Sequence, residues 1–219
     1  MSPPPYRAVI FDMDGVLTDS EPAFFAAVND VLARYGKRIT VDEYRPCIGT
    51  LTDEMWSRVR ALKDVPATVD ELVEIYEEPL MRRLHEPRPP LPGAHELIAT
   101  LQGRGVPLGM CTASYQRWVD VILPSAGIDH AFDAVVTAGM VGSTKPDPAP
   151  YVLAASLLGV PAAACVVVED STAGLTSALR AGAYVVQLRA TDTAAPPMEG
   201  VGMVIESLRD FPLALVCEC

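Results

Sequence analysis

One stretch decides the fold: Ala8-Val-Ile-Phe-Asp-Met-Asp-Gly-Val-Leu-Thr-Asp19. Its first four residues are apolar, and two aspartates separated by one residue, Asp12 and Asp14, follow directly. A short, uninterrupted apolar run predicts a strand that is buried on both faces, and the acids after it predict a loop. Gly15 permits a sharp turn at this point. Because α/β folds bind ligands at the carboxyl ends of parallel strands, the stretch predicts an α/β protein with a polar site here.

Five later segments are also short apolar runs rich in β-branched residues. They lie at residues 106–110, 134–136, 165–168, 183–186 and 202–205. Helix-like stretches separate most of them, and a last helix is expected over residues 207–211. Strands that are apolar throughout and that alternate with helices predict a parallel sheet covered on both faces.

Residues 20–87 interrupt the strand pattern. Ser20-Glu-Pro22 combines a capping residue with an early proline, which favours a helix start, and this helix is expected to end before Gly36. Apolar residues at helical spacing predict two more helices over residues 51–62 and 69–84. This interval is therefore predicted to be all helical.

Two domains follow from this pattern. Residues 1–19 and 88–219 are expected to form the parallel-sheet core, with residues 20–87 inserted as a helical domain after the first strand. The insert ends in a proline-rich segment, residues 86–93, whose composition is typical of a semi-rigid linker.

The charge balance excludes two classes of partner. The chain has 219 residues, with 28 Asp and Glu against 17 Lys and Arg, and a net charge of −11 at pH 7. Such a field repels nucleic acid and anionic membrane surfaces. It should also repel a phosphorylated small molecule, unless a local cationic site offsets it.

Cysteine use and hydropathy indicate the compartment. The five cysteines contain no CxxC pair, which predicts reduced thiols. The start of the sequence lacks the apolar stretch of a signal peptide, and no run reaches the roughly 18 apolar residues that a membrane span needs. We therefore expect a cytoplasmic protein.

Three more polar positions follow strands or precede helices. Thr112 follows a predicted strand, where a hydroxyl beside a helix N-terminus can bind phosphate, although a simple helix cap is an alternative. Lys145 lies in a proline-stiffened loop, and its alternative is a solvated surface charge. Glu169 and Asp170 end another apolar run, and Asp170 could instead cap the next helix.

For Asp12 and Asp14 alone, turn formation is also an open interpretation. A calcium loop is not, because Val16 and Leu17 stand where an EF-hand needs oxygen ligands.

The four acids, Asp12, Asp14, Glu169 and Asp170, are all expected at strand ends on one edge of the sheet. Two such carboxylates 4 Å apart repel each other by up to about 4 kcal/mol at an effective dielectric constant near 20. A cation must therefore lie among them. Oxygen ligands favour a hard ion, and a few carboxylates with waters and a phosphate suit Mg²⁺ better than Ca²⁺.

The combined motifs resemble those of the haloacid dehalogenase-like hydrolase superfamily. The similarity covers nearly the whole chain, and its motifs come in the family's order. They are Asp12-Met-Asp-Gly-Val-Leu-Thr-Asp-Ser-Glu21, Thr112-Ala-Ser114, Lys145-Pro-Asp147 and Glu169-Asp-Ser-Thr-Ala-Gly174. The resemblance implies a Rossmann-like core with a helical cap domain inserted after the first strand.

It also implies catalytic roles by position. Asp12 is expected to be the nucleophile and Asp14 the general acid and base. Thr112, Ala113 and Lys145 are expected to bind the phosphate, with Lys145 also stabilising charge.

A Mg²⁺ cofactor is implied as well, held by Asp12, Asp170 and the backbone of Asp14, with support from Glu169. Substrate selection is expected in the cap near four residues. They are Glu21, Phe24, Gly49 and Thr50.

Within the superfamily, the sequence favours a phosphatase of a small metabolite, such as a sugar phosphate or phosphoglycolate. The β-phosphoglucomutase-like branch has a histidine where Phe24 stands and an arginine in the loop that here reads Gly49-Thr-Leu-Thr-Asp53. True dehalogenases lack the second acid, Asp14. A hexose-phosphate mutase is the alternative enzyme, and a phospho-acceptor signalling domain is a remoter one.

Overall fold

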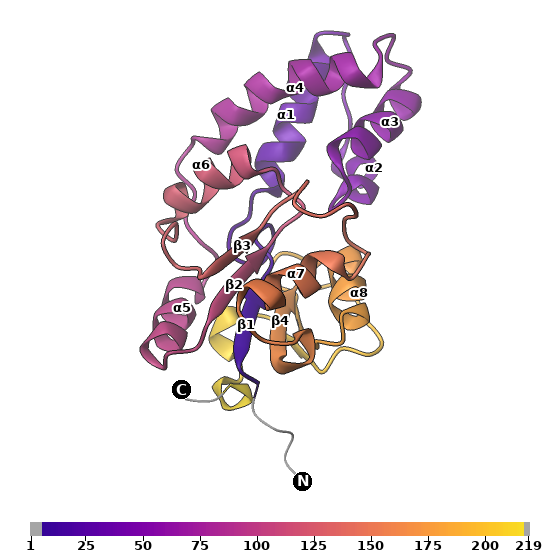
Figure 1. Cartoon of the computed structure of the whole chain (residues 1–219). Coiled ribbons are helices and arrows are strands. Elements are labelled where there is room, and N and C mark those ends of the chain that lie inside the picture. Colours follow the sequence, from indigo (N-terminus) through magenta and orange to yellow (C-terminus); the bar gives the residue numbers. More distant parts are fainter. Residues whose placement is uncertain (1–5, 217–219) are drawn as a thin grey trace. The chain divides into compact units, whose positions relative to one another are not determined.

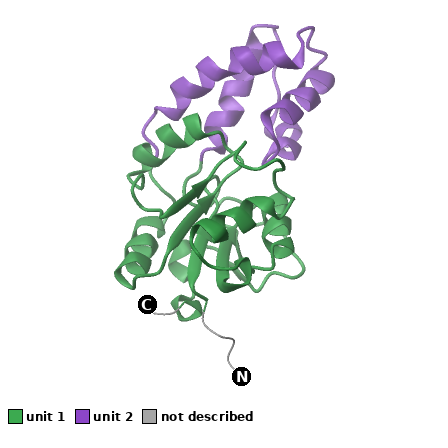
Figure 2. Cartoon of the chain, in the orientation of Figure 1, with its two compact units in different colours: residues 1–19, 89–219 green, residues 20–88 purple. Residues whose placement is uncertain are grey.

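The computed structural model describes residues 6–216. The chain forms two compact units (Figure 2). The first consists of Met1–Asp19 and Pro89–Cys219, and we call it the core unit. The second, Ser20–Arg88, is the helical unit. Each is described by itself.

A six-stranded parallel sheet forms the centre of the core unit, in the order β3-β2-β1-β4-β5-β6. Figure 1 labels β1 to β4. The strands are β1 (Ala8–Phe11), β2 (Leu108–Cys111), β3 (Ala134–Val136), β4 (Cys165–Glu169), β5 (Tyr184–Leu188) and β6 (Met203–Ile205). The parallel α/β sheet predicted from the apolar runs is therefore confirmed. Because β1 lies between β2 and β4, the chain reverses its direction of strand addition at β1, which is the position where such sheets bind ligands.

Helices connect the strands. They are α5 (Ala94–Gly103), α6 (Gln116–Ala126), α7 (Ala149–Leu157) and α8 (Thr172–Arg180). One apolar cluster joins α7 and α8 to the sheet and contains Ile10, Tyr151, Val167 and Leu175, all buried. This packing fixes the two loops that lead into α7 and α8.

Two of the differences from the predicted boundaries have clear local causes. The second strand begins at Leu108 rather than at residue 106, because the Val106 amide still bonds the Leu101 carbonyl at the end of α5. The helix expected over residues 207–211 is wrong. A single 3-10 turn, Leu208–Asp210, stands there, and Phe211 is extended because Pro212 follows it.

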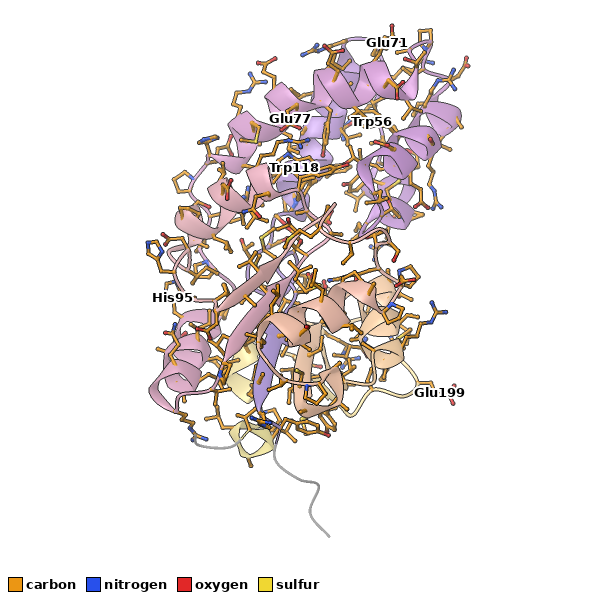
Figure 3. The ribbon with its side chains drawn as sticks, in the orientation of Figure 1. Trp56, Glu71, Glu77, His95, Trp118 and Glu199 are labelled. Carbon is orange, nitrogen blue, oxygen red and sulfur yellow. The ribbon has the colours of Figure 1, made fainter. Side chains whose placement is uncertain are left out.

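The helical unit contains the three predicted helices and two short additions. Its elements are α1 (Glu21–Ala33), α2 (Val41–Tyr44), the 3-10 turn Arg45–Cys47, α3 (Thr52–Lys63) and α4 (Val69–Leu84). Capping boxes begin α2 and α4, the second pairing Thr68 with Glu71. Trp56 of α3, labelled in Figure 3, packs edge-on against Tyr76 of α4 at 5.5 Å between ring centroids. Such aromatic packing holds α3 against α4.

Three cysteines, Cys47, Cys111 and Cys165, are buried free thiols. Cys217 and Cys219 lie outside the described residues. Among residues 6–216, no helix has the length and apolarity that a membrane crossing requires.

Candidate active site

The central strands bring the predicted polar residues to one edge of the sheet. Phe11, the last residue of β1, pairs with Met110 of β2 and Val168 of β4, so the three strands end at the same level. Asp12 and Thr112 directly follow β1 and β2, Glu169 is the last residue of β4, and Asp170 comes next. The register of the sheet is therefore what gathers residues that lie far apart in sequence.

Lys145 is buried among these residues rather than solvated. Its Nζ donates to Asp12 Oδ1 at 2.5 Å, to Glu169 Oε1 at 2.7 Å and to the Cys111 carbonyl at 2.9 Å. All three ammonium hydrogens thus have acceptors. The surface-charge alternative is wrong, because the loop before α7 directs this side chain into the site.

Burial and charge shift the ionisation of the site in the metal-free chain. Burial raises the pKa of Asp12 to about 8; Glu169 and Asp14 add to this, while Lys145 opposes it. Burial likewise raises the pKa of Asp170 well above its ordinary value, with Glu169 and Asp12 contributing. For Lys145, burial acts to lower the pKa, but the charges of Asp12 and Glu169 outweigh it and raise the pKa well above normal. The site is short of positive charge.

Two hydroxyls hold the carboxylate of Asp14. The Ser114 hydroxyl donates to Asp14 Oδ2 at 2.9 Å and that of Thr112 at 3.2 Å. The Ser114 amide donates in turn to Thr112 Oγ1 at 3.0 Å. Thr112 therefore does not cap α6, whose N-cap is Tyr115. Sequence reasoning missed Ser114, although its place two residues after Thr112 in the same motif was a usable signal.

Glu169 is the most constrained acid of the site. It is fully buried, and its carboxylate accepts five hydrogen bonds. Oε1 accepts from Lys145 and from the Tyr151 hydroxyl, and Oε2 accepts from the Asp170 and Ser171 amides and the Ser171 hydroxyl. A Cβ at Gly174 would overlap this carboxylate. Glu169 thus fixes the turn between β4 and α8.

Asp170 is left available by this arrangement. Ser171, not Asp170, caps α8, with its hydroxyl accepting from the Gly174 amide at 3.0 Å. Oδ1 of Asp170 is buried and has no hydrogen-bond partner among residues 6–216. The loop after β1 packs close to it, since a Cβ at Gly15 would overlap the Asp170 carboxylate.

The acids fit a hard cation. Asp12, Glu169 and Asp170 each offer a carboxylate oxygen, and these oxygens lie within 4.8 Å of one another. The buried, unpartnered Asp170 Oδ1 needs a positive partner. Oxygen ligands of this kind suit Mg²⁺. The Asp14 carboxylate is not part of this group and faces the two hydroxyls instead.

The family model of the haloacid dehalogenase-like hydrolases matches residues 6–182 of this chain. The chain is a haloacid dehalogenase-like hydrolase. The resemblance inferred from the motifs is confirmed, and so is the expectation of an enzyme. Because the family is one of hydrolases, membership also argues against the alternative of a phospho-acceptor signalling domain.

Relatives of this hydrolase include the fructose-1-phosphate phosphatase YqaB of Escherichia coli, 31% identical over 84% of this chain and 97% of that protein. The chloroplastic Arabidopsis thaliana protein SUPPRESSOR OF QUENCHING 1 is 34% identical over 84% of this chain, a match that spans 18% of that protein. Among solved structures, CbbY from Rhodobacter sphaeroides in complex with phosphate has a TM-score of 0.87 and 26% identity, covering 96% of this chain and 99% of that chain.

The remaining predicted residues of the hydrolase belong to the helical unit. Glu21 begins α1 and accepts a hydrogen bond from the Tyr44 hydroxyl. Gly49 has a φ of +75°, and the Thr50 hydroxyl donates to the Cys47 carbonyl at 2.7 Å. A substrate-binding role for Glu21, Gly49 and Thr50 stays a prediction.

Proposed function

We propose that this hydrolase is a Mg²⁺-dependent phosphatase that acts on a small phosphorylated metabolite of the sugar phosphate or phosphoglycolate type. The observation that carries the proposal is the buried ion-pair cluster in which Lys145 joins Asp12 to Glu169 beside Asp170. Phosphoryl transfer requires a buried carboxylate, a fixed ammonium and an acid that binds a cation. Here these groups lie together at the carboxyl ends of the central strands.

Asp12 is the nucleophile. One of its carboxylate oxygens attacks phosphorus as the bond to the leaving oxygen breaks, which gives an aspartyl-phosphate. Asp14 donates a proton to the leaving oxygen, then takes one from the water that hydrolyses the aspartyl-phosphate. This exchange returns both carboxyl groups to their starting states. Ser114 and Thr112 orient Asp14 for both transfers.

Lys145 stabilises the charge that develops on the phosphoryl oxygens, because its ammonium is already fixed beside Asp12. Thr112 and Ala113, at the end of β2, bind the phosphate. Ala113 lies between Thr112 and Ser114 in the same loop, and it is half-buried.

Mg²⁺ is the proposed cofactor, with Asp12, Asp170 and the Asp14 backbone as its ligands and Glu169 in support. When bound, it supplies positive charge that offsets the acids and polarises the phosphoryl group. A local cationic site of this kind also explains how a chain with net charge −11 captures an anion.

The helical unit is proposed to act as a cap that selects the substrate through Glu21, Gly49 and Thr50 and excludes water. A sugar phosphate is supported by the phosphatase relative named for fructose-1-phosphate. The buried free thiols Cys47, Cys111 and Cys165 support a reducing, cytoplasmic location.

The alternative is a hexose-phosphate mutase of the β-phosphoglucomutase type, and a structural neighbour is named as a putative enzyme of that kind. Phe24 and the arginine-free loop at residues 49–53 favour the phosphatase. The two are separated by incubating the protein with a hexose monophosphate and a trace of hexose bisphosphate. A phosphatase releases inorganic phosphate, whereas a mutase interconverts the monophosphates and regenerates the bisphosphate.

The phosphatase is tested with Asp12→Asn and a generic aryl phosphate in Mg²⁺. Hydrolysis should fall to background while the thermal unfolding temperature stays near that of the wild type. Asp210→Asn, a substitution at an exposed aspartate of the same unit, should leave turnover unchanged. Undiminished turnover of Asp12→Asn would overturn the mechanism.

A further inference from the structure

Tyr151 contacts two members of the buried ion-pair cluster, Glu169 and Lys145. Its hydroxyl donates to Glu169 Oε1 at 3.1 Å, and the Lys145 ammonium lies 4.9 Å from the centre of its ring. The side chain is fully buried. Neither contact follows from the sequence motifs, because Tyr151 stands on α7, outside all of them.

The position of Tyr151 is rigid. It belongs to the apolar cluster that joins α7 to the sheet, and Ile10 of β1 and Val167 of β4 are members of the same cluster. Close packing leaves such a ring little freedom to turn. Its hydroxyl and its ring face are therefore fixed relative to β1 and β4, the strands that lead into Asp12 and Glu169.

Lys145 needs this support because its acceptors compete. Its Nζ is shared between Asp12 and Glu169, at 2.5 and 2.7 Å. Tyr151 supplies Glu169 Oε1 with a second donor, which weakens the hydrogen bond that this oxygen accepts from the Lys145 ammonium. The ring attracts the ammonium from another side. Both effects favour the position of Nζ beside Asp12.

We propose that Tyr151 is a positioning residue that holds the Lys145 ammonium at Asp12, through its hydroxyl on Glu169 and its ring beneath Nζ. This inference rests on the proposed function, in which Lys145 stabilises the transferring phosphoryl group. A ring that merely fills the core would be replaceable by phenylalanine without effect on Lys145.

The chain offers a direct readout, because it has only three lysines, Lys37, Lys63 and Lys145. In metal-free protein labelled with ¹⁵N-lysine, the buried Lys145 ammonium should give a slowly exchanging NMR signal, assigned by its loss in Lys145→Met. Tyr151→Phe should shift this signal or speed its exchange. The signal of Lys63, paired with Glu43 in the helical unit, should not move.

Kinetics provide the second readout. With an aryl phosphate and saturating Mg²⁺, Tyr151→Phe should lower kcat roughly tenfold, as expected for a lost hydrogen bond to a charged group, with KM within about twofold. Tyr151→Leu also removes the ring and should lower kcat roughly fivefold further. Tyr184→Phe is the same change at a core-unit tyrosine whose ring centre lies 5.0 Å from that of Tyr6, and it should alter neither readout.

A Tyr151→Phe variant with an unchanged Lys145 signal overturns the proposal, and so does a shifted signal with unchanged kcat. Wild-type protein that gives no slowly exchanging Lys145 signal also overturns it, even if no variant folds. If the wild type hydrolyses no phosphomonoester but the Lys145 signal responds to Tyr151→Phe, the positioning stands and the proposed function is what fails.

Discussion

The hydroxyl of Ser114 donates a 2.9 Å hydrogen bond to Oδ2 of Asp14, so the proposed general acid is held by a residue of the neighbouring strand's loop. Ser114 is itself buried, and its amide bonds Thr112 Oγ1. Asp14 is thus oriented by a small network rather than by its own loop alone. Catalysis should depend on that network.

Ser114→Ala is expected to lower kcat about tenfold, because Asp14 loses one of its two orienting hydroxyls, with little change in KM. Steady-state kinetics on an aryl phosphate measure both constants. Ser125→Ala, which removes a hydroxyl bonded to the Ile122 carbonyl on α6, is the matched control. Equal loss in the two variants would deny Ser114 a special role.

Lys145→Met should lower the free energy of unfolding by about 3 kcal/mol at pH 7, because it leaves buried carboxylates without their cation. Urea titration in the absence of metal measures the loss. Lys63→Met removes a lysine paired with Glu43 outside the site and should cost much less, because solvent screens that pair. A cost of Lys145→Met no greater than that of Lys63→Met would contradict the buried ion-pair cluster.

Gly174→Ala should destabilise the protein, although replacing glycine by alanine in a helix usually stabilises it. Alanine in a helix normally stabilises by about 1 kcal/mol relative to glycine, and Gly103→Ala in α5, where a Cβ would meet no atom within 4 Å, should do so. In α8 the same change would force the Cβ into the Glu169 carboxylate. Gly174→Ala should therefore lower both the unfolding temperature and kcat. Stabilisation of both variants would show that Glu169 is not confined as described.

Mg²⁺ binding should release protons. Burial raises the pKa of Asp12 to about 8 in the metal-free chain and that of Asp170 well above its ordinary value, so these neighbouring acids together retain a proton at pH 7 that a binding cation displaces. The apparent affinity for Mg²⁺ should rise by up to about tenfold per pH unit between pH 6 and 8. Titration calorimetry at pH 7 in buffers of different ionisation enthalpy measures the protons released. Asp12→Asn should reduce this release, and a wild type that releases none would contradict the raised pKa.

Most of the fold and the site could be predicted because the signals were local. The apolar runs gave the strands, and Asp12, Asp14, Thr112 and Lys145 lie at strand ends or in the loops that precede helices. Prediction erred where one neighbour overrode a local pattern, as when Pro212 ended the expected last helix after a single turn.

Tyr151 and Ser114 were missed for a different reason. The role of Tyr151 arises from a contact with Glu169, which stands on another element, and no spacing within α7 reports it. Ser114, in the loop after β2, donates to Asp14, in the loop after the neighbouring strand β1. The packing of α7 on the sheet and the register of β1 against β2 bring these pairs together.

The central claim, that Asp12 carries the phosphoryl group, is tested most directly by trapping it. Asp14→Asn should still accept phosphate from an aryl phosphate, whose leaving group needs no proton, but should hydrolyse the aspartyl-phosphate slowly. After acid quenching and peptide mass spectrometry, the account predicts one added phosphoryl group on Asp12. A chain that turns over the substrate but carries no phosphoryl group, or carries it on another residue, would contradict the account.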